Sequence, residues 1–79
     1  MKLHFNWVLI RDSVVLDGIF EDYDEAFDTM RYNMSSYYGT WKVICMTDQD
    51  LKKWMRGLIS IFDCMEKARG YGNLSARHL

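Results

Sequence analysis

Proline is absent from this chain of 79 residues, and glycine occurs only five times. Average usage would give about four prolines in a chain of this length, so its long periodic segments are uninterrupted. No apolar run approaches the roughly 20 residues that span a bilayer. The first seven residues contain no uninterrupted apolar segment of the kind found in a secretory signal. We therefore expect a soluble protein located in the cytoplasm.

Cysteine is also scarce. Cys45 and Cys64 are the only two, each lies in an apolar stretch, and no C-x-x-C spacing joins them. Small disulfide scaffolds carry more cysteines than this, so we expect two reduced, buried thiols. The two histidines, His4 and His78, lie at opposite ends of the chain without a second ligand at metal-binding spacing. No metal site and no cofactor is therefore expected.

The composition is that of an ordinary globular domain. Hydrophobic residues make up 49% of the chain and charged residues 27%, which excludes a disordered chain because the apolar surface suffices to offset the ordering entropy. A chain this short forms a single core. We expect one compact domain over residues 1–70 and a flexible tail over residues 71–79, where hydrophobic periodicity ends.

Periodicity predicts three strands and two helices. Leu3, Phe5, Trp7 and Leu9 recur at every second position, which is the period of a strand. Further strands are expected at about 14–20 and 40–47, and amphipathic helices at about 22–39 and 48–70.

Capping signals mark where these helices begin. Asp22 with Glu25 forms a potential capping box, and Thr47 to Asp50 is a second start signal. Gly57 lies inside the second helix, where it costs roughly 1 kcal/mol relative to alanine. The apolar stripe of that helix includes Leu58 and Phe62. We expect the core to contain most of the large aromatic residues, which are Phe5, Trp7, Phe27, Trp41, Trp54 and Phe62.

Two positions compete for the turn between the first two strands. Arg11-Asp12-Ser13 is polar and turn-like, whereas Asp17-Gly18 is a strong hairpin signal. A turn at 17–18 would leave only two residues for the returning strand before the acidic segment begins. We favour the turn at 11–13, with Gly18 in a β-bulge.

The expected fold class is α+β. The order β-β-α-β-α predicts a two-layer sandwich, with a three-stranded mixed sheet, the first strand in the middle, and two helices on one face. The opposite face would then be open and largely apolar. Its apolar members are Val8, Ile10, Val15, Ile19, Ile44 and Met46. An exposed patch of this kind marks an interface with a second copy or with another protein. A one-residue register slip, or a tail folded over that face, would remove it.

An acidic segment supplies a second candidate protein-binding surface. It has six carboxylates within twelve residues: Asp17, Glu21, Asp22, Asp24, Glu25 and Asp28. The Ca²⁺-binding EF-hand pattern is absent. The plain interpretation is a solvated helix start, and the functional interpretation is recognition of a basic protein surface.

Basic residues gather in the second half of the chain. Lys52, Lys53 and Arg56 lie off the apolar stripe of the second helix, beside Trp54. They favour an alternative function, a nucleic-acid-binding module. The net charge of −1 argues against it, because such modules are basic as a whole.

No catalytic motif is present, so we do not expect an enzyme. The leading hypothesis is a small non-enzymatic module that binds another protein through its apolar sheet face and the acidic segment over residues 17–28, as a monomer or as a homodimer. In size and layout the chain is similar to many accessory proteins of phages and mobile elements, including inhibitors of host defence proteins. No particular residue carries that likeness.

Overall fold

The computed structural model describes residues 4–70, and the expected tail at 71–79 lies outside them. The elements follow in the order β1 (Phe5–Arg11), β2 (Val15–Phe20), α1 (Tyr23–Met34), β3 (Trp41–Thr47), α2 (Asp48–Met55) and α3 (Ile61–Arg69). The α+β class and the three strands are confirmed. The expected second helix is divided into α2 and α3.

The sheet has the strand order β2-β1-β3, with β1 in the middle as predicted. Both neighbouring pairs are antiparallel, so the sheet is antiparallel and the description "mixed" is wrong. The connection through α1 leaves β2 and β3 running in the same direction. Because β1 lies between them, no parallel pair forms.

The turn between β1 and β2 lies at residues 12–14, which confirms the preference for the earlier site. Asp12 and Ser13 have φ angles of 54° and 66°, the left-handed region that tight hairpin turns use. The Val14 N–H donates to the Arg11 carbonyl at 3.3 Å. The Asp12 Oδ1 accepts from the Thr40 N–H at 2.9 Å, which ties the turn to the start of β3.

The predicted bulge is also present. Leu9 pairs with Gly18 and Ile10 with Leu16, so Asp17 is the extra residue on β2. Extra residues of this kind bend a strand and increase its twist. The bulge therefore lies beside Gly18, one residue from the predicted position.

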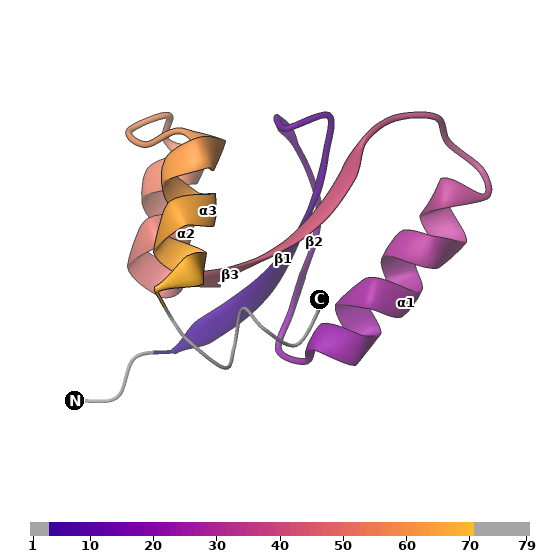
Figure 1. The fold of residues 1–79 in the computed structure, drawn as a ribbon, viewed down its shortest axis with the longest axis horizontal. Coiled ribbons are helices and arrows are strands. Elements are labelled where there is room, and N and C mark those ends of the chain that lie inside the picture. The colour runs from indigo at the N-terminus through magenta and orange to yellow at the C-terminus, as the bar shows by residue number, and fades with distance from the viewer. Residues whose placement is uncertain (1–3, 71–79) are drawn as a thin grey trace.

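Helices cover both faces of the sheet, in contrast to the two-layer arrangement predicted. Figure 1 shows α1 on one side of the strands and α2 with α3 on the other. On the first side the ring of Trp7 packs edge-on against Tyr23 of α1, with centroids 5.0 Å apart. Val8, the next residue along β1, points to the opposite face and is fully buried as well. The molecule therefore has three layers.

The division of the second helix makes the third layer. Gly57 has a φ of +76°, which ends α2, and Ser60 starts α3 with a capping box to Asp63. The two helices then lie side by side (Figure 1), joined by an ion pair of 3.0 Å between Lys67 Nζ and Asp50 Oδ1. A continuous helix could not fold back over the sheet in this way.

Cap geometry at the other helix starts agrees with the sequence in one case. Thr47 caps α2 by accepting from the Asp50 N–H, as its capping signal predicts. Asp22 precedes α1 without any side-chain capping hydrogen bond, so the box with Glu25 is wrong. The helix also ends at Met34, five residues before the glycine that was expected to stop it.

Gly57→Ala is expected to lower the free energy of unfolding by about 1 kcal/mol, because alanine has a Cβ that disfavours positive φ. A Cβ added at Gly57 meets no atom within 4 Å, so backbone strain is the whole effect. Urea unfolding measures the change. Gly57→Asn is the matched control and should cost less, since asparagine tolerates this region. Equal stability of the alanine variant and the native chain would contradict the left-handed break.

Candidate functional site

The sheet face that was predicted to be open is covered by α2 and α3 over the core residues of β1 and β3. Val8 and Ile10 are 0% exposed, Ile44 is 5% exposed and Met46 is 1% exposed. These four side chains belong to the core beneath α2 and α3 and cannot contact a partner. The other two predicted members, Val15 and Ile19, are exposed on the edge strand β2.

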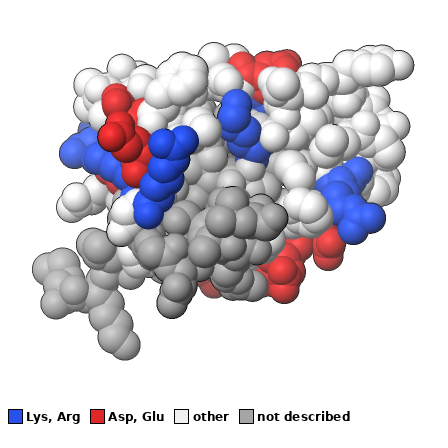
Figure 2. All heavy atoms as spheres, viewed as in Figure 1, with Lys and Arg blue, Asp and Glu red and all other residues white. Residues whose placement is uncertain are grey.

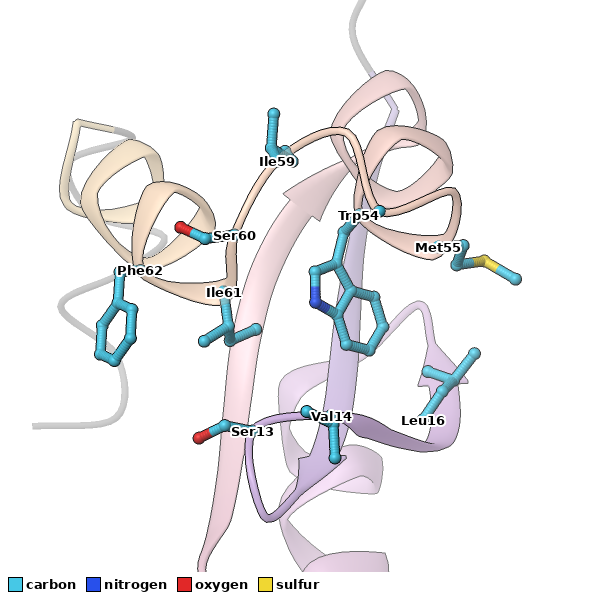
Figure 3. A pocket seen from close by; sticks show the side chains of 10 residues that line it. Ser13, Val14, Leu16, Trp54, Met55, Ile59, Ser60, Ile61 and Phe62 are labelled. Carbon is cyan, nitrogen blue, oxygen red and sulfur yellow. The ribbon is translucent and has the colours of Figure 1, made fainter.

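An open apolar groove lies instead between the tip of the β1–β2 hairpin and the α2–α3 loop. Its volume is about 610 Å³. Figure 3 shows Trp54 across the middle of this groove, with Met55 and Phe62 on opposite sides. We call it the Trp54 groove. Its lining comprises Ser13, Val14, Leu16, Trp54, Met55, Gly57, Ile59, Ser60, Ile61 and Phe62.

Uneven helix coverage explains the groove. On one face α1 contacts all three strands, whereas α2 and α3 pack mainly against β3. Leu16 of β2 pairs with Ile10, so both belong to the face that α2 and α3 occupy. Because those helices do not extend over β2, Leu16 lines a groove and is not buried beneath a helix.

Large apolar side chains stand exposed around the groove. Val14 is 74% exposed, Met55 59%, Leu58 68% and Phe62 71%. Soluble chains rarely expose so many neighbouring apolar groups unless the surface binds something. This surface is the strongest candidate site in the described residues.

Sequence reasoning missed this site because it treated residues 48–70 as one helix. On a continuous helix, Leu58 and Phe62 share the apolar stripe with Trp54. The break at Gly57 reorients the chain, so that Ile61, Cys64 and Ala68 face the core. Phe62, at 71% exposed, is therefore an exception among the large aromatic residues that were expected to lie mostly in the core. The Ser60–Asp63 capping box was the available signal.

The acidic segment is on the surface, with one exception. Exposed carboxylates before and along α1 are Glu21, Asp22, Asp24, Glu25 and Asp28. In Figure 2 acidic atoms gather at the lower edge of the molecule, where Figure 1 places the first turns of α1. Asp17 differs, since its side chain is mostly buried and lies 3.4 Å from the Arg11 Nε.

The acidic segment and the Trp54 groove do not form one surface. Five of the six carboxylates belong to α1 and the loop before it, and α1 lies on the opposite side of the sheet from α2 and α3 (Figure 1). A partner that contacts one of these surfaces leaves the other accessible. A partner that contacts both surfaces must therefore reach around the edge of the sheet.

The three predicted nucleic-acid residues, Lys52, Lys53 and Arg56, are all exposed on α2 and its C-terminal cap. Trp54, their aromatic neighbour, is partly buried and packs against the core. Its ring is thus less available for stacking on a base than the sequence suggested. Lys67, farther along the chain, is held by Asp50.

Polar contacts around His4 were not foreseen. The His4 Nδ1 lies 2.9 Å from the Asp48 Oδ1, and its Nε2 lies 3.5 Å from the Glu21 Oε1. Asn6 donates to the same Asp48 oxygen at 2.7 Å. These contacts link the start of β1 to α2 and to the loop before α1. They raise the pKa of His4, chiefly through the hydrogen bond to Asp48.

Stability should therefore decrease slightly as the pH rises through the raised pKa of His4. The protonated imidazole is favoured in the folded state, so its contribution is complete below the unfolded pKa and is lost above the folded one. Unfolding measured at about pH 6 and pH 8 should show this decrease in the native chain and not in His4→Gln. The imidazole resonance of His4 should titrate above 6.5, and titration at or below that value would contradict the arrangement.

The two cysteines are free and buried, as predicted. Cys45 pairs with Trp7 and lies on the α1 face, whereas Cys64 belongs to α3. Burial raises the pKa of the Cys45 thiol to about 11 and also raises that of Cys64. A thiol with a pKa of about 11, such as that of Cys45, remains protonated at neutral pH and is a poor nucleophile.

Within residues 4–70, no group of three or more metal-ligating side chains could hold a metal ion. Of the helices there, none has the length and apolar character needed to cross a membrane.

Comparisons with protein-family models, curated proteins and solved structures find no match to this chain. Its function must therefore be argued from its own residues.

Proposed function

We propose that this protein acts by binding a protein chain, without catalysis of its own, and that the Trp54 groove is the contact surface. The observation that carries the proposal is a concave, apolar and exposed surface in a domain whose central strand is buried on both faces. Such surfaces are typical of protein interaction sites.

The residues around the groove suit a protein contact better than a small polar ligand. Met55 and Phe62 project at opposite sides of Trp54 (Figure 3), and methionine and aromatic residues are enriched at interface cores. Polar groups are few in the lining. Ser60, one of them, already accepts from the Asp63 N–H at 3.1 Å.

Binding without catalysis is also how a small inhibitor acts, because covering a surface of its target is sufficient. The hypothesis that the chain is an accessory protein of a phage or mobile element, inhibiting a host protein, is one form of this proposal. The exposed carboxylates of α1 would offer such a target a second contact, on the far side of the sheet. Charge reversal at Asp22 and Glu25 should then weaken binding without unfolding the domain.

Nucleic acid remains the alternative ligand, supported by the exposure of Lys52, Lys53 and Arg56. Binding of nucleic acid through these basic side chains would depend steeply on salt concentration. Retention of the protein on single-stranded DNA at low salt, lost in a Lys52→Glu and Lys53→Glu variant, would favour this alternative over the groove.

Photocrosslinking tests the main proposal. The photoreactive residue p-benzoylphenylalanine replaces Phe62 at the groove or, as a matched control, Tyr32 on α1, which is 75% exposed. Irradiation in the expressing cell should join the Phe62 variant to one defined protein chain, and Leu16→Glu in the same variant should abolish the product. Equal products from both positions, or none from Phe62, would contradict the proposal.

A further inference from the structure

We infer that the occupant of the Trp54 groove is a second copy of this chain, docked groove to groove about a two-fold axis. This inference rests on the proposed function and names its partner. It follows from two features of the groove: the arrangement of its apolar side chains and the charges on its two sides.

The apolar features are self-complementary. A two-fold interface brings each residue of one copy against a different residue of the other, reciprocally. Met55 and Phe62 lie on opposite sides of Trp54 (Figure 3). An axis running between them places Met55 of one copy against Phe62 of the other, twice. Each projecting side chain then covers part of the opposite groove.

The charged residues next to Met55 and Phe62 along their helices are of opposite sign. On the α2 side, Lys52 lies one turn before Met55 and Arg56 directly follows it. On the α3 side, Asp63 and Glu66 lie within one turn of Phe62. The same axis that pairs Met55 with Phe62 therefore brings the bases of α2 towards the acids of α3 in the second copy.

A partner of one charge sign fits less well. An acidic chain in the groove would approach Asp63 and Glu66, and a basic chain would approach Lys52 and Arg56. Of the basic residues of α3, Lys67 is held by Asp50, and Arg69 lies about two turns beyond Phe62. A net charge of −1 per copy also adds little general repulsion between copies.

Sedimentation equilibrium of the full chain, from about 5 µM to about 1 mM, measures the association. A reversible monomer–dimer equilibrium is expected, and Phe62→Glu should weaken it at least about tenfold, as for an anchor at the centre of an interface. Tyr32→Glu is the matched control and should leave it unchanged. Circular dichroism must show that both variants remain folded, which the exposure of both side chains predicts.

Charge reversal tests the orientation of the two copies. Arg56→Glu and Glu66→Arg should each weaken the dimer by about threefold, and the two together should restore it because the pair is inverted. Within residues 4–70, neither side chain makes an ion pair or a hydrogen bond that its reversal would remove. Additive weakening in the double variant would contradict the proposed axis.

The outcomes separate this inference from the proposed function. A monomer at every concentration, or a dimer unaffected by Phe62→Glu, would overturn the second copy as the occupant. If Phe62 nevertheless crosslinks to a different protein in the cell, the groove remains a protein-binding site. If neither association nor crosslinking occurs, both proposals fail.

Discussion

Val8→Asp should abolish folding. The Val8 side chain is 0% exposed and belongs to the core beneath α2 and α3. A carboxylate at this position would be buried without a partner, which costs more than about 4 kcal/mol. That is most of the total stability of a typical small domain, which begins at about 5 kcal/mol.

The matched control for Val8→Asp is Val14→Asp. Val14 is the same residue type in the same hairpin but is 74% exposed, so its replacement should change stability by less than about 0.5 kcal/mol. Circular dichroism with thermal and urea unfolding distinguishes the two. A folded Val8→Asp variant with native stability would mean that this face of the sheet is open to water.

Trp7→Ala should lower the free energy of unfolding by about 3–5 kcal/mol, the usual cost of removing a large buried aromatic side chain. Trp7 is 3% exposed and meets Tyr23 of α1 edge-on, with ring centroids 5.0 Å apart. Alanine would leave a cavity between the sheet and α1 that the surrounding backbone can close only in part.

Tyr32→Ala is the control for the Trp7 prediction. Tyr32 is a large aromatic residue of α1, the helix that Trp7 packs against, but its side chain is 75% exposed. It should change stability by less than about 0.5 kcal/mol. Urea unfolding of the two variants gives both numbers. A loss below about 1 kcal/mol for Trp7→Ala would show that α1 does not cover this face.

The two core variants together test the layered fold, because Trp7 and Val8 are consecutive residues of β1. Side chains of consecutive strand residues point to opposite faces. In a two-layer domain one of the two positions would tolerate a polar substitution. In a three-layer domain neither does, and that is the expected result.

Local sequence signals predict much of the strand arrangement. The alternation from Leu3 to Leu9 and the polar turn after it mark the hairpin, and Gly18 indicates the bulge. These features depend on backbone preferences over a few residues, which a single sequence records. The central place of β1 follows from the short hairpin and from the longer connection through α1.

The covering of the second face was not predicted, although one signal for it was present. Trp7 to Ile10 are apolar without interruption, a pattern typical of a strand buried on both faces. The decisive event, however, is the break after Met55. A glycine inside a helix costs only about 1 kcal/mol, so Gly57 alone could not distinguish a tolerated interior residue from a helix end.

The Trp54 groove lay beyond sequence reasoning for a different reason. Its walls come from the hairpin and from the α2–α3 loop, about 40 residues apart in the chain. Which side chains remain exposed depends on how α3 is oriented after the loop. Phe62 and Ile61 are neighbours of similar hydrophobicity, yet one is 71% exposed and the other 6%. Periodicity distinguishes them only once the helix is known to begin at Ser60, because Ile61, Cys64 and Ala68 then share one face.

Thiol labelling of a Phe62→Cys variant most directly tests the central claim, that the central strand of the sheet is covered on both faces while the Trp54 groove is exposed. The native thiols report on the two layers, since Cys45 lies on the α1 face and Cys64 in α3, both buried. The variant is labelled at low concentration, where self-association is weakest, and labels are counted by mass. We expect one label to add rapidly, at position 62, with Cys45 and Cys64 protected until the chain unfolds. Rapid labelling of a native thiol, or a protected residue 62, would contradict the account.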